Sequence, residues 1–345
     1  TGGQNALMMM RCDKGKIYNN DFSFNSGIGI GMYRCNGNEV SFNRLNFNVR
    51  GYSHAVYNRG QDSAGILVYE QSSFNVFYKN SATHSGDGFF LWAGQSTMDK
   101  GEGGCNDNVI VGNDFSYAPT NGVEVTFSRV RVSGNRIFDC DHGIWGGYSY
   151  SSAFSNNHFR NNRIGIAIEH GQYNRITDNV FIGDREAVKL WSRKTQPSSW
   201  GYARYRDTRS VGYLITGNSF NSNPVVFSLN RTDSLQVANN RYTGYGALWQ
   251  MDSTVTHLDS VEPEQADTTL VLPVVPGAVD PFKGNGKLAG RQHIMITEWG
   301  PYDFRYPICW LNNPVEKSDT MRFSVWGPKG TWSLKDSMGV FGFSQ

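Results

Sequence analysis

Two glutamates of this 345-residue chain lie in short segments in which apolar residues alternate with other types. Glu124 lies in GVEVTFS, and Glu169 lies in GIAIEHG directly before His170. Two carboxyl groups about 6.5 to 9.5 Å apart can act as a general acid and a base that activates water. We therefore predict acid–base chemistry at Glu124 and Glu169, with an ordinary solvated carboxylate as the alternative for Glu124.

Two further residues are secondary candidates for the same chemistry. His170 could tune Glu169 or donate to a substrate, or it could instead bond a loop carbonyl. Asp87, in SGDG, could orient a water, or it could instead cap backbone N–H groups of its turn. For Asp87 we favour the capping role.

The elements that carry these residues belong to a repeat marked by asparagine. The spacings between the marker residues are 23, 37, 33, 22, 22, 22, 39 and 22, which is a bare repeat five times and a repeat with an insertion three times. Each unit continues with a small residue and a short strand of alternating residues, from GIGMYRC to AVKLWSR. Such a repeat predicts the coils of a parallel β-solenoid, with the asparagines stacked as a ladder. The markers are Asn20, Asn43, Asn80, Asn113, Asn135, Asn157, Asn179, Asn218 and Asn240.

This pattern resembles the right-handed parallel β-helix superfamily, which includes pectate lyases, polygalacturonases and NosD-type carbohydrate-binding and sugar-hydrolase repeats. The resemblance implies an all-β fold and a carbohydrate-active protein that is secreted, periplasmic or on the cell surface. It does not imply one activity, because the superfamily contains hydrolases, lyases, epimerases and passive binders. The Asn-Thr-Asp, Asp-Asp and His-Gly patterns of polygalacturonases are missing, so that family's site residues are not carried over.

The repeat predicts three regions along the chain. A parallel β-helix covers residues 1–255, a proline-containing linker covers 256–290, and short strands typical of a small β-sandwich cover 291–345. The segment QNALMMMRC already aligns with the later strands. We therefore expect further coils before Thr1, as a missing region or on an additional chain, because solenoid ends need covering.

Side-chain parity predicts which residues face outward on the strands that begin with the small residue. The second and fourth positions, such as Val123 and Val125, are apolar and point inward, so the third and fifth face solvent. Flat aromatic rings beside charged groups suit sugar rings. Glu124 and Glu169 are then two coils and one outward position apart, with Cα atoms roughly 12 Å apart. The residues predicted to bind substrate on this face are Trp92, Trp145, Tyr148, Lys189, Trp191 and Arg193.

Three insertions, at about 51–64, 94–108 and 194–209, are predicted to leave from one side of the solenoid and wall a groove. The first adds Arg59 as a substrate-binding candidate, and the stretch GYARYRDTR makes the groove more basic than the whole chain. Arginine suits carboxylate or sulfate recognition, so we expect an anionic glycan, uronate or sulfated. A sulfated fucan is one version, by analogy with β-helical fucanases.

Three functions follow from this groove. The first is an endo-acting glycoside hydrolase that uses Glu124 and Glu169. The second is a polysaccharide lyase, whose base would be Lys189, Arg193, His170 or Arg59. The third is a non-catalytic glycan-binding surface module. We expect no cofactor, with calcium considered only for the lyase, where its ligands would be Asp99, Glu102 and Asp107.

Composition excludes other classes of protein. With 32 basic and 30 acidic residues the net charge is +2, which gives no electrostatic footprint for nucleic acid. No 18-residue apolar run that could cross a membrane is present. The five cysteines show no zinc-site spacing.

Overall fold

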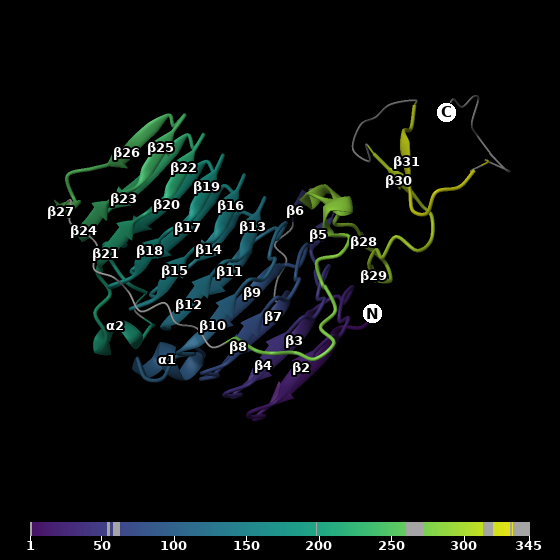
Figure 1. Ribbon diagram of the computed structural model, residues 1–345, viewed down its shortest axis with the longest axis horizontal. Coiled ribbons are helices and arrows are strands. Elements are labelled where there is room, and N and C mark those ends of the chain that lie inside the picture. The colour runs from purple at the N-terminus through teal and green to yellow at the C-terminus, as the bar shows by residue number, and fades with distance from the viewer. Residues whose placement is uncertain are drawn as a thin grey trace. The chain divides into compact units, whose positions relative to one another are not determined.

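The computed structural model describes residues 2–53, 56–57, 63–197, 199–259, 272–312, 320–331 and 333. Stacked coils form the main body, and each coil contributes one strand to each sheet that it enters (Figure 1). Sheets A and B contain ten strands each and sheet C contains five. Every pairing within these three sheets is parallel, which confirms the predicted parallel β-helix.

Sheet A contains the strands that begin with the small residue: β1 (Asn5–Met10), β3 (Ile28–Tyr33), β7 (Ala64–Tyr69), β9 (Asp87–Trp92), β11 (Asn121–Val125), β14 (His142–Trp145), β17 (Ile164–Glu169), β20 (Glu186–Trp191), β23 (Val225–Asn230) and β26 (Ala247–Met251). Sheet B contains β2 (Lys16–Tyr18), β4 (Glu39–Ser41), β8 (Val76–Tyr78), β10 (Asn108–Val111), β12 (Val130–Ser133), β15 (Ala153–Ser155), β18 (Arg175–Thr177), β21 (Ser210–Thr216), β24 (Thr232–Ala238) and β27 (Thr256–Asp259). Sheet C contains β13 (Arg136–Phe138), β16 (His158–Arg160), β19 (Val180–Ile182), β22 (Ser219–Asn221) and β25 (Arg241–Thr243).

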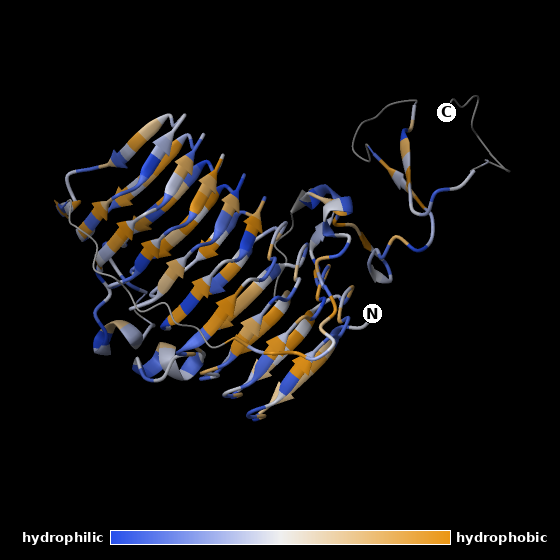
Figure 2. Ribbon diagram, in the orientation of Figure 1, coloured by the Kyte–Doolittle hydropathy of each residue, from blue (hydrophilic) through white to orange (hydrophobic). Residues whose placement is uncertain are grey.

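The core consists of aliphatic and aromatic side chains that repeat from coil to coil, as the hydrophobic bands along the strands show (Figure 2). Phe159, Phe181 and Phe220 stack in successive coils, with ring centroids 4.7 and 4.9 Å apart. The predicted inward residues Val123 and Val125 are both fully buried. Each coil can bury these side chains only against its neighbours, so the stack is the unit of stability.

The nine marker asparagines form the predicted ladder from Asn20 to Asn240. In each step the side-chain Nδ2 donates to Oδ1 of the next marker, at 2.9 to 3.1 Å. The backbone N–H of the same residue donates to that oxygen as well. The predicted repeat is therefore confirmed, because the three insertions leave this register intact.

The insertions leave sheet A at opposite ends of its strands, which corrects the prediction of one common side. The helices α1 (Gln95–Lys100) and α2 (Tyr202–Tyr205) follow β9 and β20, between sheet A and sheet B. The pair β5 (Tyr52–Ser53) and β6 (Val56–Tyr57) precedes β7 instead. In the described part of the insertions, α1 contacts α2, and Arg206 Nε, directly after α2, donates to the carbonyl of Gly101, directly after α1, at 2.6 Å. Alignment by the small residue did not distinguish an insertion before a strand from one after it.

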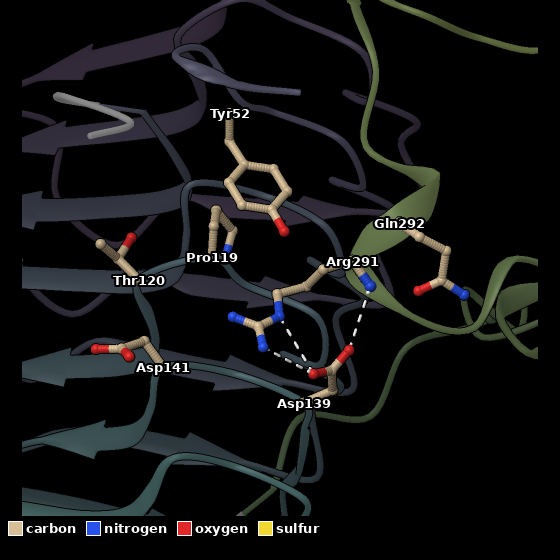
Figure 3. Close-up of a pocket in the computed structure, with 7 residues that line it drawn as sticks. All are labelled: Tyr52, Pro119, Thr120, Asp139, Asp141, Arg291 and Gln292. Carbon is tan, nitrogen blue, oxygen red and sulfur yellow. Dashed lines mark hydrogen bonds and ion pairs between the residues drawn. The ribbon is translucent and has the colours of Figure 1, made fainter. Parts of the chain in front are cut away.

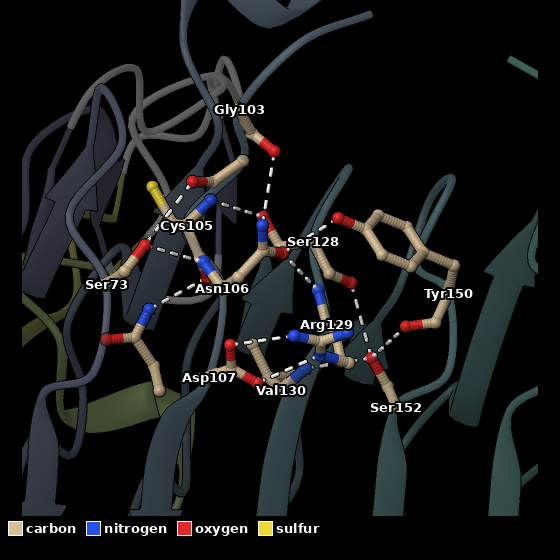
Figure 4. Close-up of polar contacts among 12 residues, drawn as sticks. Ser73, Gly103, Cys105, Asn106, Asp107, Ser128, Arg129, Val130, Tyr150 and Ser152 are labelled. Atoms are coloured by element: carbon tan, nitrogen blue, oxygen red, sulfur yellow. Dashed lines mark hydrogen bonds and ion pairs between the residues drawn. The ribbon is translucent and has the colours of Figure 1, made fainter.

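The end of the 94–108 insertion rejoins the coil through polar contacts (Figure 4). The backbone N–H of Asn106 donates to Ser73 Oγ at 3.0 Å, and its Oδ1 accepts from the backbone of Arg129 at 2.9 Å. Arg129 also forms two bonds of 2.9 and 2.8 Å with Asp107. Asp107, a predicted calcium ligand, is therefore paired with an arginine.

After the coils, residues 272–301 pack on the β-helix. Arg44 Nη2 donates to the carbonyl of Lys283 at 2.8 Å, and Asn285 Nδ2 donates to Ser81 Oγ at 2.9 Å. Two compact units divide between Pro301 and Tyr302, whereas the sequence placed a boundary at 291. Proline content suggested a linker here, but the hydrogen bonds made by this segment are not visible in composition. The elements of this part are η1 (Asn285–Leu288), η2 (Arg291–His293), β28 (Ile296–Thr297) and β29 (Gly300–Pro301).

In the described part of the second unit, β30 (Ile308–Leu311) and β31 (Phe323–Trp326) form an antiparallel pair. The chain is thus an all-β parallel helix followed by small antiparallel sheets.

Candidate functional site

Glu124 lies at an outward position of β11, paired in register with Phe90 on one side and Trp145 on the other. Its side chain is partly buried, and its Oε2 accepts a hydrogen bond of 2.8 Å from Asn121 Nδ2. Burial raises the pKa of Glu124 well above its ordinary value, and the charge of Asp87 raises it further, while the bond from Asn121 opposes both. These effects hold Glu124 toward the protonated form that a general acid needs.

Asp87 begins β9, one coil before Glu124, and is 9% exposed. Its Oδ1 accepts the backbone N–H of Asn121 at 2.9 Å, so it caps backbone of the next coil. Asp87 and Glu124 are therefore two carboxyl groups that contact the same asparagine, and the charge of Asp87 raises the pKa of Glu124. Such a pair is typical of acid–base sites.

A chain of polar residues leads from Glu124 across the starts of β11, β14 and β17. His142 Nδ1 is 3.0 Å from Asn121 Oδ1, and its Nε2 is 2.9 Å from Arg163 Nη2. A guanidinium group can only donate, so Nε2 accepts and Nδ1 carries the proton that is donated to Asn121. Burial lowers the pKa of His142 to about 4, so the ring is neutral above that pH. Asp141 holds Arg163 in place with bonds of 2.5 and 2.8 Å.

This chain orients Asn121 so that its NH₂ group, and not its carbonyl, faces Glu124. We call Asn121, His142, Arg163 and Asp141 the positioning chain. Sequence analysis did not find it, although a signal was present. In four units the residue directly before the small residue is polar: Asp87, Asn121, His142 and Glu186.

Glu169 has a different environment from the exposed one that parity suggested. It is 5% exposed, and its Oε1 accepts from Trp191 Nε1 at 2.9 Å and from Arg193 Nε at 2.5 Å. Trp191 occupies the neighbouring position in the next coil, and Arg193 follows it where the 194–209 insertion begins. The prediction of a solvent-facing Glu169 was wrong, because the arginine closes over the carboxylate.

His170 is held by loop residues on both ring nitrogens. Nδ1 lies 2.5 Å from the carbonyl of Thr208, and Nε2 accepts from the backbone of Arg193 at 3.1 Å and from Gln196 at 2.9 Å. Burial lowers the pKa of His170, which agrees with a neutral ring in this pattern. The bond to a loop carbonyl, which was the alternative for this residue, is therefore present.

Tyr148 was predicted to be a surface subsite, but it is 7% exposed beneath α2. Its ring stacks between Phe127 and His170, with centroids 4.5 and 4.7 Å away, and meets Tyr202 edge-on. Trp92 packs on the same cluster. The insertions thus cover part of the aromatic row that strand parity had assigned to solvent.

Trp145 and Trp191 remain partly exposed on sheet A, with ring centroids 5.6 Å apart. Trp145 also lies 5.2 Å from the ring of His142. The Lys189 ammonium lies 5.8 Å from the Trp191 ring and 3.1 Å from Glu186. The structure therefore places the indole ring of Trp145 beside Glu124 and His142, with the indole ring of Trp191 next to it.

Other predicted residues stand as follows. Arg59 lies outside the described residues. Asp99 accepts a bond of 2.8 Å from Gln95. Within the described ranges, no three His, Cys, Asp or Glu side chains gather as they would around a metal ion.

Comparison with known proteins agrees with the fold. Residues 53–199 match the family model described as Right handed beta helix region. This span includes Asp87, Glu124, the positioning chain and Glu169. No curated protein matches the chain significantly. Among the helices in the described residues, none has the length and hydropathy to cross a membrane.

Proposed function

The chain carries a right-handed parallel β-helix, a fold of carbohydrate-active proteins, and on that premise we propose that it is a glycoside hydrolase with Glu124 as general acid. One observation carries the proposal. A partly buried glutamic acid, whose pKa is raised by burial and by the charge of Asp87, contacts the same asparagine as that second carboxylate and lies in register with Trp145.

In the proposed reaction the glycosidic C–O bond breaks as Glu124 gives its proton to the leaving oxygen. A water molecule attacks the anomeric carbon, and Asp87 accepts the proton that this water loses. The raised pKa keeps the proton on Glu124 before the reaction, and the charge of Asp87 causes part of that shift. Asp87 replaces Glu169 as the second carboxylate because Glu169 is engaged by Arg193 and Trp191.

The remaining side chains bind and orient. The indole rings of Trp145 and Trp191 offer flat apolar surfaces to sugar rings. Asn121 holds Glu124 Oε2, which leaves Oε1 to present the proton. The side chain of Arg193 is 64% exposed although it is paired, so an anionic group of an extended polysaccharide can meet it there. A polymeric substrate of this kind lies outside the cell, so we infer a secreted, periplasmic or surface location.

A polysaccharide lyase is less well supported by the contacts. Elimination needs a basic residue whose lone pair is available to the sugar. Lys189 is paired with Glu186, Arg193 is paired with Glu169, and His170 has both ring nitrogens engaged.

Incubation with a panel of uronate-containing and sulfated polysaccharides tests the proposal. A hydrolase releases new reducing ends without an unsaturated, ultraviolet-absorbing product, and Glu124→Gln abolishes the release while retaining binding to the same glycan. Formation of an unsaturated product would assign a lyase. Glycan binding without cleavage by the wild-type protein would assign a binding module, and undiminished cleavage by Glu124→Gln would overturn the role of Glu124.

A further inference from the structure

A pocket of about 500 Å³ opens at the turns that precede β11 and β14, beside the candidate site (Figure 3). Ligand pockets in proteins commonly measure about 300 to 1,000 Å³. Turns that lead into sheet A form one side, while β5 and η2, which lie outside the coil repeat, form the other. The lining residues are Tyr52, Pro119, Thr120, Asp139, Asp141, Arg291 and Gln292.

The wall of this pocket is tied firmly to the β-helix. Arg291 bonds Asp139 through its backbone N–H at 3.2 Å and through its guanidinium at 3.0 and 3.2 Å. The segment after η2 is joined to the β5 segment, because the backbone N–H of Ile296 donates to Ser53 Oγ at 3.0 Å. The two segments added to the coil repeat therefore hold each other and enclose a defined space.

The lining groups suit a neutral ligand rich in hydroxyls. Asp139 and Asp141 each face an arginine, which leaves little net charge, while their oxygens can still accept bonds from hydroxyl groups. Burial raises the pKa of Tyr52, so its hydroxyl remains a donor at neutral pH. Figure 3 shows this hydroxyl directed toward Arg291, with Thr120 and Asp141 on the other side of the space from Gln292.

The pocket adjoins the candidate site in sequence and through one shared residue. Thr120 and Asp141 directly precede Asn121 at the start of β11 and His142 at the start of β14, and Asp141 both lines the pocket and belongs to the positioning chain. We propose that this pocket is a subsite for one neutral sugar residue of the glycan that Glu124 cleaves. That the two sites share one glycan rests on the proposed function, whereas sugar binding by the pocket does not.

Binding of neutral monosaccharides to the full chain tests the pocket, measured by saturation-transfer NMR on hexoses and 6-deoxyhexoses. Gln292→Ala and Tyr52→Phe are expected to weaken binding of the preferred sugar about tenfold. The matched controls Gln236→Ala and Tyr173→Phe, at exposed positions elsewhere on the coils, are expected to leave it unchanged.

The outcomes separate this inference from the proposed function. If no neutral sugar binds, or if the pocket variants bind as well as the wild type, the pocket proposal is overturned even when Glu124→Gln is inactive. If pocket variants lose the sugar while Glu124→Gln keeps full activity, the subsite stands and the role of Glu124 falls.

A second inference comes from an independent observation inside the coils. Asn162, Asp184 and Asn223 occupy one ladder position in successive coils, and all three are buried. Asn162 donates to Asp184 Oδ1 through its backbone at 2.8 Å and through Nδ2 at 2.7 Å. Asp184 therefore stands where a ladder would normally have asparagine.

The next step of this ladder has no hydrogen bond between the two side-chain oxygens. Asp184 Oδ2 and Asn223 Oδ1 are both buried without a hydrogen-bond partner. In the marker ladder the corresponding step is a bond from Nδ2 to the next Oδ1. We infer that Asp184 carries a proton on Oδ2 and donates it to Asn223 Oδ1, which satisfies both orphaned atoms.

A buried proton of this kind links stability to pH. Burial raises the pKa of Asp184 to about 7, and no charged group among the described residues contributes to the shift. The folded state then binds a proton that the unfolded state releases near pH 4. Stability is therefore greatest below that pH and falls as pH rises toward and through 7.

Thermal unfolding of wild type and Asp184→Asn between pH 5 and pH 9 tests this inference. Asparagine supplies the missing donor without a titrating proton, so the variant is expected to lose less stability than wild type across this range. Exposed Asp178→Asn is the control and is expected to follow the wild type. Difference infrared spectroscopy at neutral pH should show a carboxylic acid band that Asp184→Asn removes. If the stability of wild type and of Asp184→Asn changed with pH in parallel, or if no such band appeared, Asp184 would be charged and the side-chain amide of Asn223 would be rotated.

Discussion

Two glutamates predicted to point outward from sheet A, Glu124 and Glu169, have opposite surroundings. Glu124 meets an amide, a second carboxylate and a neutral histidine chain, with no cation bonded to it among the described residues. Glu169, at the end of β17, is bonded to a guanidinium and an indole N–H. The first arrangement favours the protonated acid, whereas the second satisfies a carboxylate. Outward direction on a strand therefore does not establish a catalytic role, because the neighbours beyond the coil decide it.

The largest expected effect comes from removing the proton donor. Glu124→Gln should lower kcat by about 10² to 10⁴-fold, the usual contribution of general acid catalysis. Its melting temperature should stay close to the wild-type value, because glutamine can still accept the bond from Asn121. Steady-state kinetics and thermal unfolding on one preparation measure both. If Glu124→Gln were unstable as well as inactive, Glu124 would not differ from Glu169 in having a catalytic rather than a structural role.

Glu169→Gln should show the opposite division, with the loss mainly in stability. Removing the carboxylate leaves Arg193 without its ion pair and the Trp191 N–H with a poorer acceptor, at a cost of about 1 to 3 kcal/mol. Urea unfolding measures this loss. Glu186→Gln is the control, since the Glu186 side chain is more exposed than that of Glu169, at 16% against 6%, and its pair with Lys189 contributes about 0 to 1 kcal/mol. If Glu169→Gln lost activity with unchanged stability, Glu169 would return as the second catalytic carboxylate.

The coils could be predicted from the sequence because their register depends on local spacing. The 22-residue interval fixed the ladder and the inward positions, and these hold across every insertion. The outward positions of Glu124, Trp145 and Trp191 followed from the same parity.

The segments that cover the outer face of sheet A could not be predicted in the same way. Arg193 reaches Glu169, and α2 covers Tyr148, through segments that have no repeat to align. Residues 272–296 return to the β-helix through polar side-chain contacts, such as those between Arg291 and Asp139, whose partners are 152 residues apart. Such contacts depend on the path of each segment in space, and composition reports only that the segment contains proline and glycine.

A smaller effect is expected from the indole next to Glu124. Trp145→Ala should raise KM about tenfold, because a sugar ring that covers about 50 Å² of apolar surface contributes roughly 1.3 kcal/mol. Trp145→Phe should keep most of that affinity. Initial rates on the cleaved polysaccharide measure both variants. Equal KM values for Trp145→Ala and wild type would place the glycan away from this ring.

The smallest expected effect is a shift in the pKa of Glu124, which Asp87→Asn and Asn121→Ala should move in opposite directions. A general acid must be protonated, so the rate falls as pH rises through its pKa, which defines the alkaline limb of the pH profile. Asp87→Asn removes a charge that raises this pKa, so the titration of Glu124 moves to lower pH. Asn121→Ala removes a bond that lowers it, so the titration moves to higher pH.

These two shifts are best read by NMR titration of the Glu124 carboxyl carbon, because Asp87→Asn is itself expected to be nearly inactive. Asp99→Asn, on α1, is the matched charge change away from the site and should leave the titration in place. The Asn121→Ala variant stays active enough for a pH profile, whose alkaline limb should move with the NMR value. Shifts of the same sign in both variants would show that a general loosening of the strand, and not the two named interactions, sets the proton affinity of Glu124.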